Sequence, residues 1–208
     1  MIPTEPIRPL HDVWLRPRRV FRGLAEAPVG FVDQLLGAAQ GVLVCLAWSR
    51  AEDAGKSNSI AQILGTSLLL GSIVGIAILY LMAAIYTRLG NRAGGHAAHN
   101  QVVHVLAYGG VPMATCLAVW VVTALLAGEV CFIQSPQPDV EGFVEILLHL
   151  QVTSYVLLGL WSIVLQVMGF SEILGFTPRK AFALWVLGQL IGALFALLLL
   201  VLRLLLLP

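Results

Sequence analysis

The side chains best suited to chemistry form a polar row that recurs every four residues. Glu141, Glu145 and His149 follow one another at this spacing, and Thr153 continues the row. On a helix, all four would lie on one face. Two carboxylates and an imidazole in that arrangement could bind a cation or relay a proton. An ordinary solvated helix start would give the same pattern, because the helix dipole favours acidic residues near its N-terminus.

Other candidate chemistry is sparse. His96 and His99 lie three residues apart in a glycine-rich segment that leads to His104, but no carboxylate or thiolate is nearby in sequence. A zinc site needs such further ligands, so we interpret this segment as a solvated loop. The chain contains no His-Glu-x-x-His, Gly-x-Ser-x-Gly or Cys-x-x-Cys pattern. We therefore expect neither an enzyme nor a bound cofactor.

The elements that carry these residues are predicted to be membrane-spanning helices. Hydrophobic residues make up 59% of the chain and charged residues only 11%, so much of its surface should face lipid. A stretch of 18 or more apolar residues can cross a hydrocarbon layer of ~30 Å, and a backbone in lipid must close its hydrogen bonds within its own helix. Five stretches qualify: Phe31–Trp48, Ile63–Tyr86, Val102–Ala127, Phe143–Met168 and Ala181–Leu207. The predicted fold class is an all-α, polytopic integral membrane protein with these five transmembrane helices in one bundle.

The basic residues predict how the helices are oriented. Nine of the twelve arginines and lysines precede the first stretch or lie in the second and fourth connections. Positive charge is retained on the cytoplasmic side of membranes. We therefore expect the N-terminus in the cytoplasm and the C-terminus outside. The chain divides into an N-terminal arm, residues 1–28, and a five-helix transmembrane domain, residues 29–208.

The arm is expected to form a short basic helix on the membrane surface. Pro17 suits a first helical turn, after which Val20, Phe21 and Leu24 share one face. This face would enter the cytoplasmic leaflet, while the arginines meet anionic headgroups. The alternative is that the arginines only fix the topology. The predicted lipid or partner contacts are Trp14, Arg16, Pro17, Arg18, Arg19, Phe21 and Arg22.

Small residues spaced four apart predict where helices approach closely. Such rows let backbones meet in lipid, where no hydrophobic effect drives helices together. The pairs singled out are Gly37 with Gly41, Gly71 with Gly75, and Gly188 with Gly192. Packing within one bundle and self-association are both open. A kink is expected in the third stretch, where Tyr108 and two glycines precede Pro112.

The chain resembles the Yip1 domain family in three segments: Trp14–Phe21, Leu106–Pro112, and Trp161–Glu172 followed by Arg179 to Ala181. The similarity extends from about Trp14 to Leu202 and is closest to the prokaryotic branch. The Asp-Leu-Tyr-Gly-Pro motif that eukaryotic members use with GTPases is missing, so no GTPase-binding residue is inferred. The resemblance implies a multi-pass protein of a prokaryotic inner membrane.

The function implied by this resemblance is non-enzymatic. We expect a protein that acts in membrane organisation, or as an accessory or adaptor subunit of a membrane complex. Its partners would be membrane lipids and other membrane proteins or a second copy of the chain, with no nucleic acid. The alternative is a small transporter or ion-conducting component that uses Glu141, Glu145 and His149. Against it, five helices do not divide into two equal inverted repeats.

Overall fold

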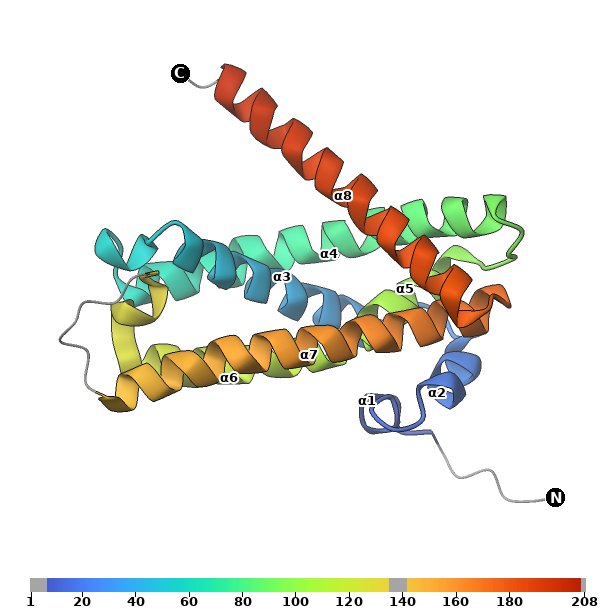
Figure 1. The fold of residues 1–208 in the computed structure, drawn as a ribbon, viewed down its shortest axis with the longest axis horizontal. Coiled ribbons are helices and arrows are strands. Elements are labelled where there is room, and N and C mark those ends of the chain that lie inside the picture. The colour runs from blue at the N-terminus through green and yellow to red at the C-terminus, as the bar shows by residue number, and fades with distance from the viewer. Residues whose placement is uncertain (1–6, 135–141, 207–208) are drawn as a thin grey trace.

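The computed structural model describes residues 7–134 and 142–206, and the regular elements of these residues are all helical. Figure 1 shows α3, α4, α6 and α7 running side by side, with α8 leaning away from them. The elements in chain order are α1 (Pro9–Asp12), α2 (Pro17–Leu24), α3 (Phe31–Ala51), η1 (Ala54–Lys56), α4 (Ile60–Arg92), α5 (His99–Gly109), α6 (Val111–Ala127), η2 (Gly128–Phe132), α7 (Gly142–Leu174) and α8 (Pro178–Leu206).

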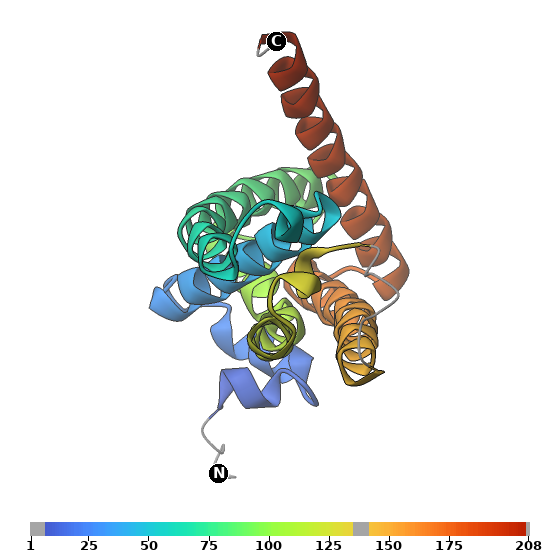
Figure 2. The ribbon, with the colours of Figure 1, turned by 90° about the vertical axis from the view of Figure 1, so that its left-hand side faces the viewer.

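Four segments of the described chain are long and apolar enough to cross a membrane: α3, α4, the path from His99 to Phe132, and α7. α8 is a helix of 29 residues, but its passage across the membrane stays a prediction. Its first half packs on α7 and α4, and its C-terminal half projects out of the bundle (Figures 1 and 2). The structure is therefore a helical membrane bundle with four candidate spans.

The third predicted stretch is two helices. α5 ends at Gly109 and α6 begins at Val111, with Gly110 between them at φ −87° and ψ 1°. Pro112, in the first turn of α6, lacks the N–H that would bond the carbonyl of Tyr108. The break falls where the glycines and Pro112 predicted a kink.

Two buried clusters hold the bundle together, one at each end. The first includes Phe21, Tyr86, Val105 and Phe170, at the end where α2 packs; we call this the arm end. The second includes Leu46, Ile63, Trp120, Phe132 and Leu148, next to η1 and η2; we call this the far end.

Glycines set the distance between α3 and α4. A Cβ atom built on Gly41 would overlap the carbonyl oxygen of Gly71 and the Cα atom of Gly75. A Cβ on Gly75 would lie 2.7 Å from the Cα of Gly41, and one on Gly71 would lie 2.7 Å from the Cα of Val42. Backbone atoms cannot rotate out of the way as side chains can. These glycines therefore allow a contact within the bundle that no larger residue allows.

We expect Gly41→Ala to destabilise the bundle by about 1–3 kcal/mol, the usual cost of overpacking a tight interior. Gly65→Ala is the matched control, because a Cβ on Gly65 has no neighbour within 4 Å. Alanine favours a helix over glycine by about 1 kcal/mol, so the control should be unchanged or slightly stabilised. Thermal unfolding in detergent compares them, and equal midpoints for the two variants would contradict the close crossing.

Candidate functional site

The arm is folded against the bundle. Val13, Pro17, Val20 and Phe21 are buried, and Trp14 is half-buried against the same cluster. The Phe21 ring lies on α7 where Gly169 has no side chain, since a Cβ there would be 3.0 Å from Phe21 Cε2. The expected lipid-facing side of the arm is thus the side that faces protein. This corrects the surface-helix interpretation: α2 is amphipathic as predicted, but its apolar face packs on α5 and α7 and not in the leaflet.

An ion pair joins the arm to the end of α7. Arg22 donates from Nη2 and Nε to Oε1 of Glu172, at 2.7 and 2.9 Å. The Arg22 side chain is 75% exposed, so the pair contributes at most about 1 kcal/mol. It fixes the direction of α2 more than it stabilises the fold.

The arm end also contains a buried polar pair. His104 Nδ1 lies 2.7 Å from Oδ1 of Asp33, and the two side chains are 3% and 4% exposed. Oδ2 of Asp33 accepts the N–H of Gly30 at 2.8 Å at the start of α3. His104 Nε2 lies 3.1 Å from the carbonyl oxygen of Ala27, in the linker between the arm and α3. The pair therefore joins the linker, α3 and α5.

This burial differs in part from the sequence-based expectation. The segment with His96 and His99 that leads to His104 was expected to be a solvated loop, but α5 begins at His99 and is buried along most of its length. The sequence feature that could have indicated this burial is the position of His104 inside a predicted apolar stretch. Its partner is 71 residues away in the chain, which no local pattern reveals.

The geometry fixes how many protons the pair holds. A carbonyl oxygen only accepts, so His104 Nε2 donates to Ala27. At Nδ1 one proton must lie between the imidazole and the carboxylate, either on His104 as imidazolium or on Asp33 as the acid. In both forms the pair is neutral overall. Loss of that proton would leave an uncompensated buried charge, which costs several kcal/mol.

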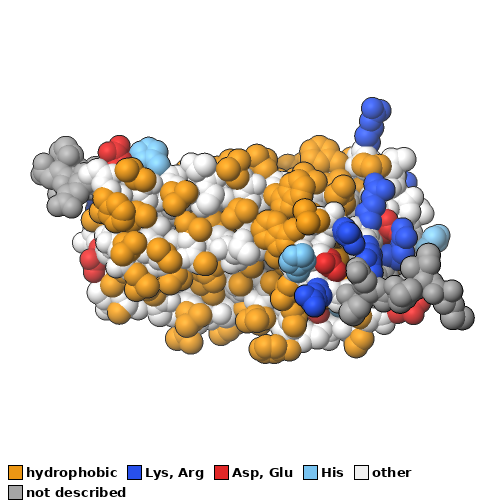
Figure 3. Space-filling view, turned by 90° about the horizontal axis from the view of Figure 1, so that it is seen from below, with side chains coloured by type: hydrophobic (Ala, Val, Ile, Leu, Met, Phe, Trp, Pro, Cys, Tyr) orange, Lys and Arg blue, Asp and Glu red, His pale blue; other side chains and the backbone are white. Residues whose placement is uncertain are grey.

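Basic side chains gather on the surface around this pair. Figure 3 shows Lys and Arg at one end of the molecule, with hydrophobic side chains over its middle. Lys180 is held by the carbonyl oxygen of Ala93 at 2.6 Å and by the Phe176 ring at 3.9 Å. Arg19 is half-buried. The exposed cations of the arm end are Arg8, Arg16, Arg18, Arg22, Arg88, Arg92, Arg179 and Lys180.

The predicted polar row on α7 does not assemble a site in the described part of the chain. Glu145 and His149 are exposed, and His149 Nδ1 donates to the backbone oxygen of Glu145 at 2.9 Å. Glu141 lies outside the described residues. Among the described residues, no group of three His, Cys, Asp or Glu side chains could hold a metal ion. His99 instead stacks on Tyr80.

At the far end, polar contacts join the α3–α4 connection to the segment that follows η2. The Gln134 N–H and the Lys56 ammonium bond the Asp53 carboxylate at 2.7 and 2.6 Å. Together they hold the pKa of Asp53 below its ordinary value. The contribution of this contact to stability is present above pH 3.8, the ordinary value, and is lost as the pH falls through the lowered pKa. Buried Gln151 accepts from Arg50 at 3.0 Å beside Cys131.

Of the other predicted glycines, Gly37 faces Leu79, and the two on α8 face aromatic and sulfur-containing side chains. A Cβ on Gly188 would overlap the Tyr86 ring, and one on Gly192 would lie 3.3 Å from the sulfur of Met82. Both contacts join α8 to α4. Tyr108 and Pro112 are buried at the junction of α5 and α6.

These features define an all-helical membrane protein whose N-terminal arm is part of its fold. The Yip1 domain model matches residues 12–202. The chain therefore belongs to the Yip1 domain family, as the sequence resemblance predicted. Comparison with curated proteins and with solved structures gave no match.

A double-mutant cycle tests the buried pair. His104→Leu should cost about 3–5 kcal/mol, because it leaves the Asp33 carboxylate buried without a partner. Asp33→Asn should be mild, since an amide N–H can donate to Nδ1 of a neutral His104. The variant with both changes should be more stable than His104→Leu alone, as measured by unfolding in detergent. Equal stability of those two variants would contradict a charged or proton-sharing pair.

Proposed function

We propose that this Yip1 family protein is a non-enzymatic accessory or adaptor subunit that docks a partner membrane protein on the basic surface of its arm end. We place that surface in the cytoplasm of a prokaryotic cell, because nine of the twelve basic residues precede α3 or lie at the adjoining ends of α4 and α8. The alternative role in membrane organisation would use the same surface toward anionic lipid.

One observation favours docking of a protein over binding of anionic lipid. The apolar face of α2 packs inside the protein, with Val20 0% and Phe21 1% exposed. A helix that inserts into a leaflet keeps that face for lipid. Here the arginines are instead presented on a folded surface, with Arg22 oriented by Glu172. Fixed cations of this kind suit recognition of an acidic protein surface.

The transport alternative gains no support from the described residues. A conduction path needs polar groups that face a common interior. Glu145 and His149 are exposed on α7. Gln151, two residues after His149, is buried and bonds Arg50 and Cys131.

Charge reversal of the basic surface tests the proposal. Arg18→Glu with Arg179→Glu should release the protein from its native complex, because each basic residue near an acidic surface contributes on the order of 1 kcal/mol. The matched control is Arg18→Lys with Arg179→Lys, which keeps both charges. Native gel electrophoresis of mildly solubilised membranes should show a larger complex for the wild type and the control only.

Two further results would decide against an adaptor. The complex could survive charge reversal, or it could be absent from the wild type. In the second case, purified protein in nanodiscs would show whether anionic lipid binds the surface instead. Unchanged thermal unfolding of the reversed variant excludes misfolding as the cause of a lost complex.

A further inference from the structure

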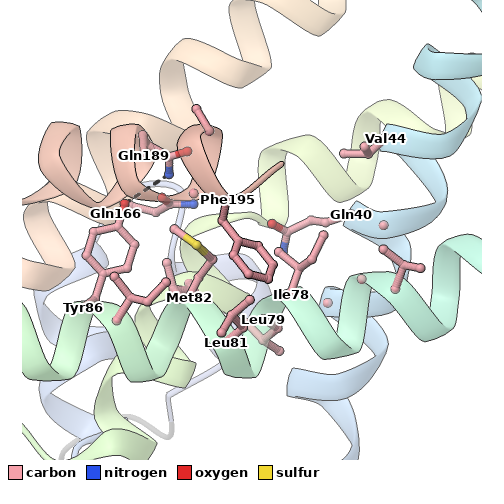
Figure 4. A pocket seen from close by; sticks show the side chains of 18 of the residues that line it. Gln40, Val44, Ile78, Leu79, Leu81, Met82, Tyr86, Gln166, Gln189 and Phe195 are labelled. Carbon is pink, nitrogen blue, oxygen red and sulfur yellow. Dashed lines mark hydrogen bonds between the residues drawn. The ribbon is translucent and has the colours of Figure 1, made fainter. Parts of the chain in front are cut away.

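A cavity of about 520 Å³ lies between α3, α4, α7 and α8. Its volume is within the range of small-molecule binding sites, about 300–1,000 Å³. Figure 4 shows Phe195 reaching from α8 toward Met82 and Leu79 of α4, with Gln166, Gln189 and Tyr86 at one end. Because α8 leans away from the bundle (Figure 2), Gln189 and Phe195 stay exposed beside the cavity.

Three glutamines line this cavity, and hydrogen bonds fix how each amide is turned. The carbonyl of Trp185 only accepts, so the Tyr86 hydroxyl donates to it at 2.9 Å. That hydroxyl therefore accepts from Gln189 Nε2 at 3.1 Å. Gln166 Oε1 must accept the Trp185 indole N–H at 2.8 Å. These bonds assign nitrogen and oxygen without ambiguity.

Gln40 is oriented in the same way. Its Nε2 donates to the carbonyl of Leu36 at 3.2 Å, so its Oε1 is the free acceptor. Within the described part of the chain, three amide atoms at the cavity have no hydrogen-bond partner: Gln40 Oε1, Gln166 Nε2 and Gln189 Oε1. The cavity thus offers two unpaired acceptor oxygens and one unpaired amide nitrogen, which carries two N–H donors.

The position of these groups makes their lack of partners costly. Gln189 lies eleven residues after Pro178, the first residue of α8, which is about 16 Å along a helix. Since this stretch is predicted to span the bilayer, we expect no water to satisfy an amide at that depth. Polar groups held there indicate a ligand that supplies the missing hydrogen bonds.

The lining also determines the chemistry of the ligand. None of the described residues that line the cavity is charged, and most are aliphatic or aromatic. A phosphate or ammonium headgroup would find no counter-charge. A hydroxyl group both donates and accepts, so it can bond Gln189 Oε1 and Gln166 Nε2 at once while a hydrocarbon chain lies along α4.

We propose that this cavity binds an uncharged lipid that carries a hydroxyl group, entering from the membrane between α8 and α4. Both a diacylglycerol and an isoprenoid alcohol have this chemistry. The site does not depend on the basic surface of the arm end, so either proposal can fail alone.

Photolabelling in phosphatidylcholine nanodiscs tests the site. The probe is a diacylglycerol with a diazirine in one acyl chain, and its adducts are mapped by mass spectrometry. We expect adducts on residues 37–45, 78–86 and 189–195. Excess unlabelled dioleoylglycerol should compete, and competition by geranylgeraniol tells whether an isoprenoid alcohol is accepted as well.

Three variants distinguish a specific site from lipid filling a gap. Gln166→Leu with Gln189→Leu should lower labelling about tenfold, because two hydrogen bonds to the hydroxyl are lost. Ala193→Phe should fill the cavity and abolish labelling. Leu194→Phe is the matched control, since Leu194 is 65% exposed, and should label as the wild type does.

The proposal is overturned if adducts spread over all lipid-facing helices, or if labelling persists in both cavity variants. It is also overturned if neither alcohol competes better than added phosphatidylcholine. A dimer that becomes monomeric on Ala193→Phe, with no specific labelling in the wild type, would show that a second copy closes the cavity instead. Size-exclusion chromatography of each variant checks that it folds.

Discussion

Asp33 and His104 meet in a part of the interior that water does not reach, and the arrangement of the arm end depends on this contact. Oδ2 of Asp33 bonds Gly30 at the start of α3, and His104 bonds Ala27 in the linker. A buried pair of this kind adds little net stability compared with apolar residues, but it is expensive to break. It therefore favours one path for the linker, and that path brings α2 onto α5 and α7.

The arm shows why the buried side of an amphipathic helix cannot be assigned from hydrophobicity alone. Lipid and protein both remove Val20 and Phe21 from water, so the roughly 1.5–3 kcal/mol for burying such a side chain does not choose between them. The choice comes from shape and from polar contacts. Gly169 leaves room for the Phe21 ring, and Glu172 meets Arg22. With the apolar face packed inside, the arginines of α2 remain on the surface, where we propose that a partner binds.

Much of the fold follows from local chemistry in the sequence. Long apolar stretches predicted α3, α4 and α7. α4 continues past the predicted end at Tyr86 to Arg92, because a helix can extend beyond the hydrocarbon layer. Pro112 marked the break before α6. The contacts of Asp33, and the amides of Gln40, Gln166 and Gln189, could not be predicted in this way. They join residues far apart in the chain, and each alone looks like an isolated polar residue in an apolar helix.

Amide hydrogen exchange in nanodiscs tests most directly whether the arm belongs to the folded bundle. If it does, the amides of residues 20–24 are protected equally in zwitterionic and anionic lipid, and added salt leaves their protection unchanged. The apolar contacts of Val20 and Phe21 do not depend on charge, so the account predicts this result. The contradicting result is protection that appears only with anionic lipid and disappears as salt screens the arginines. That result would mean that the arm binds the membrane surface instead of the bundle.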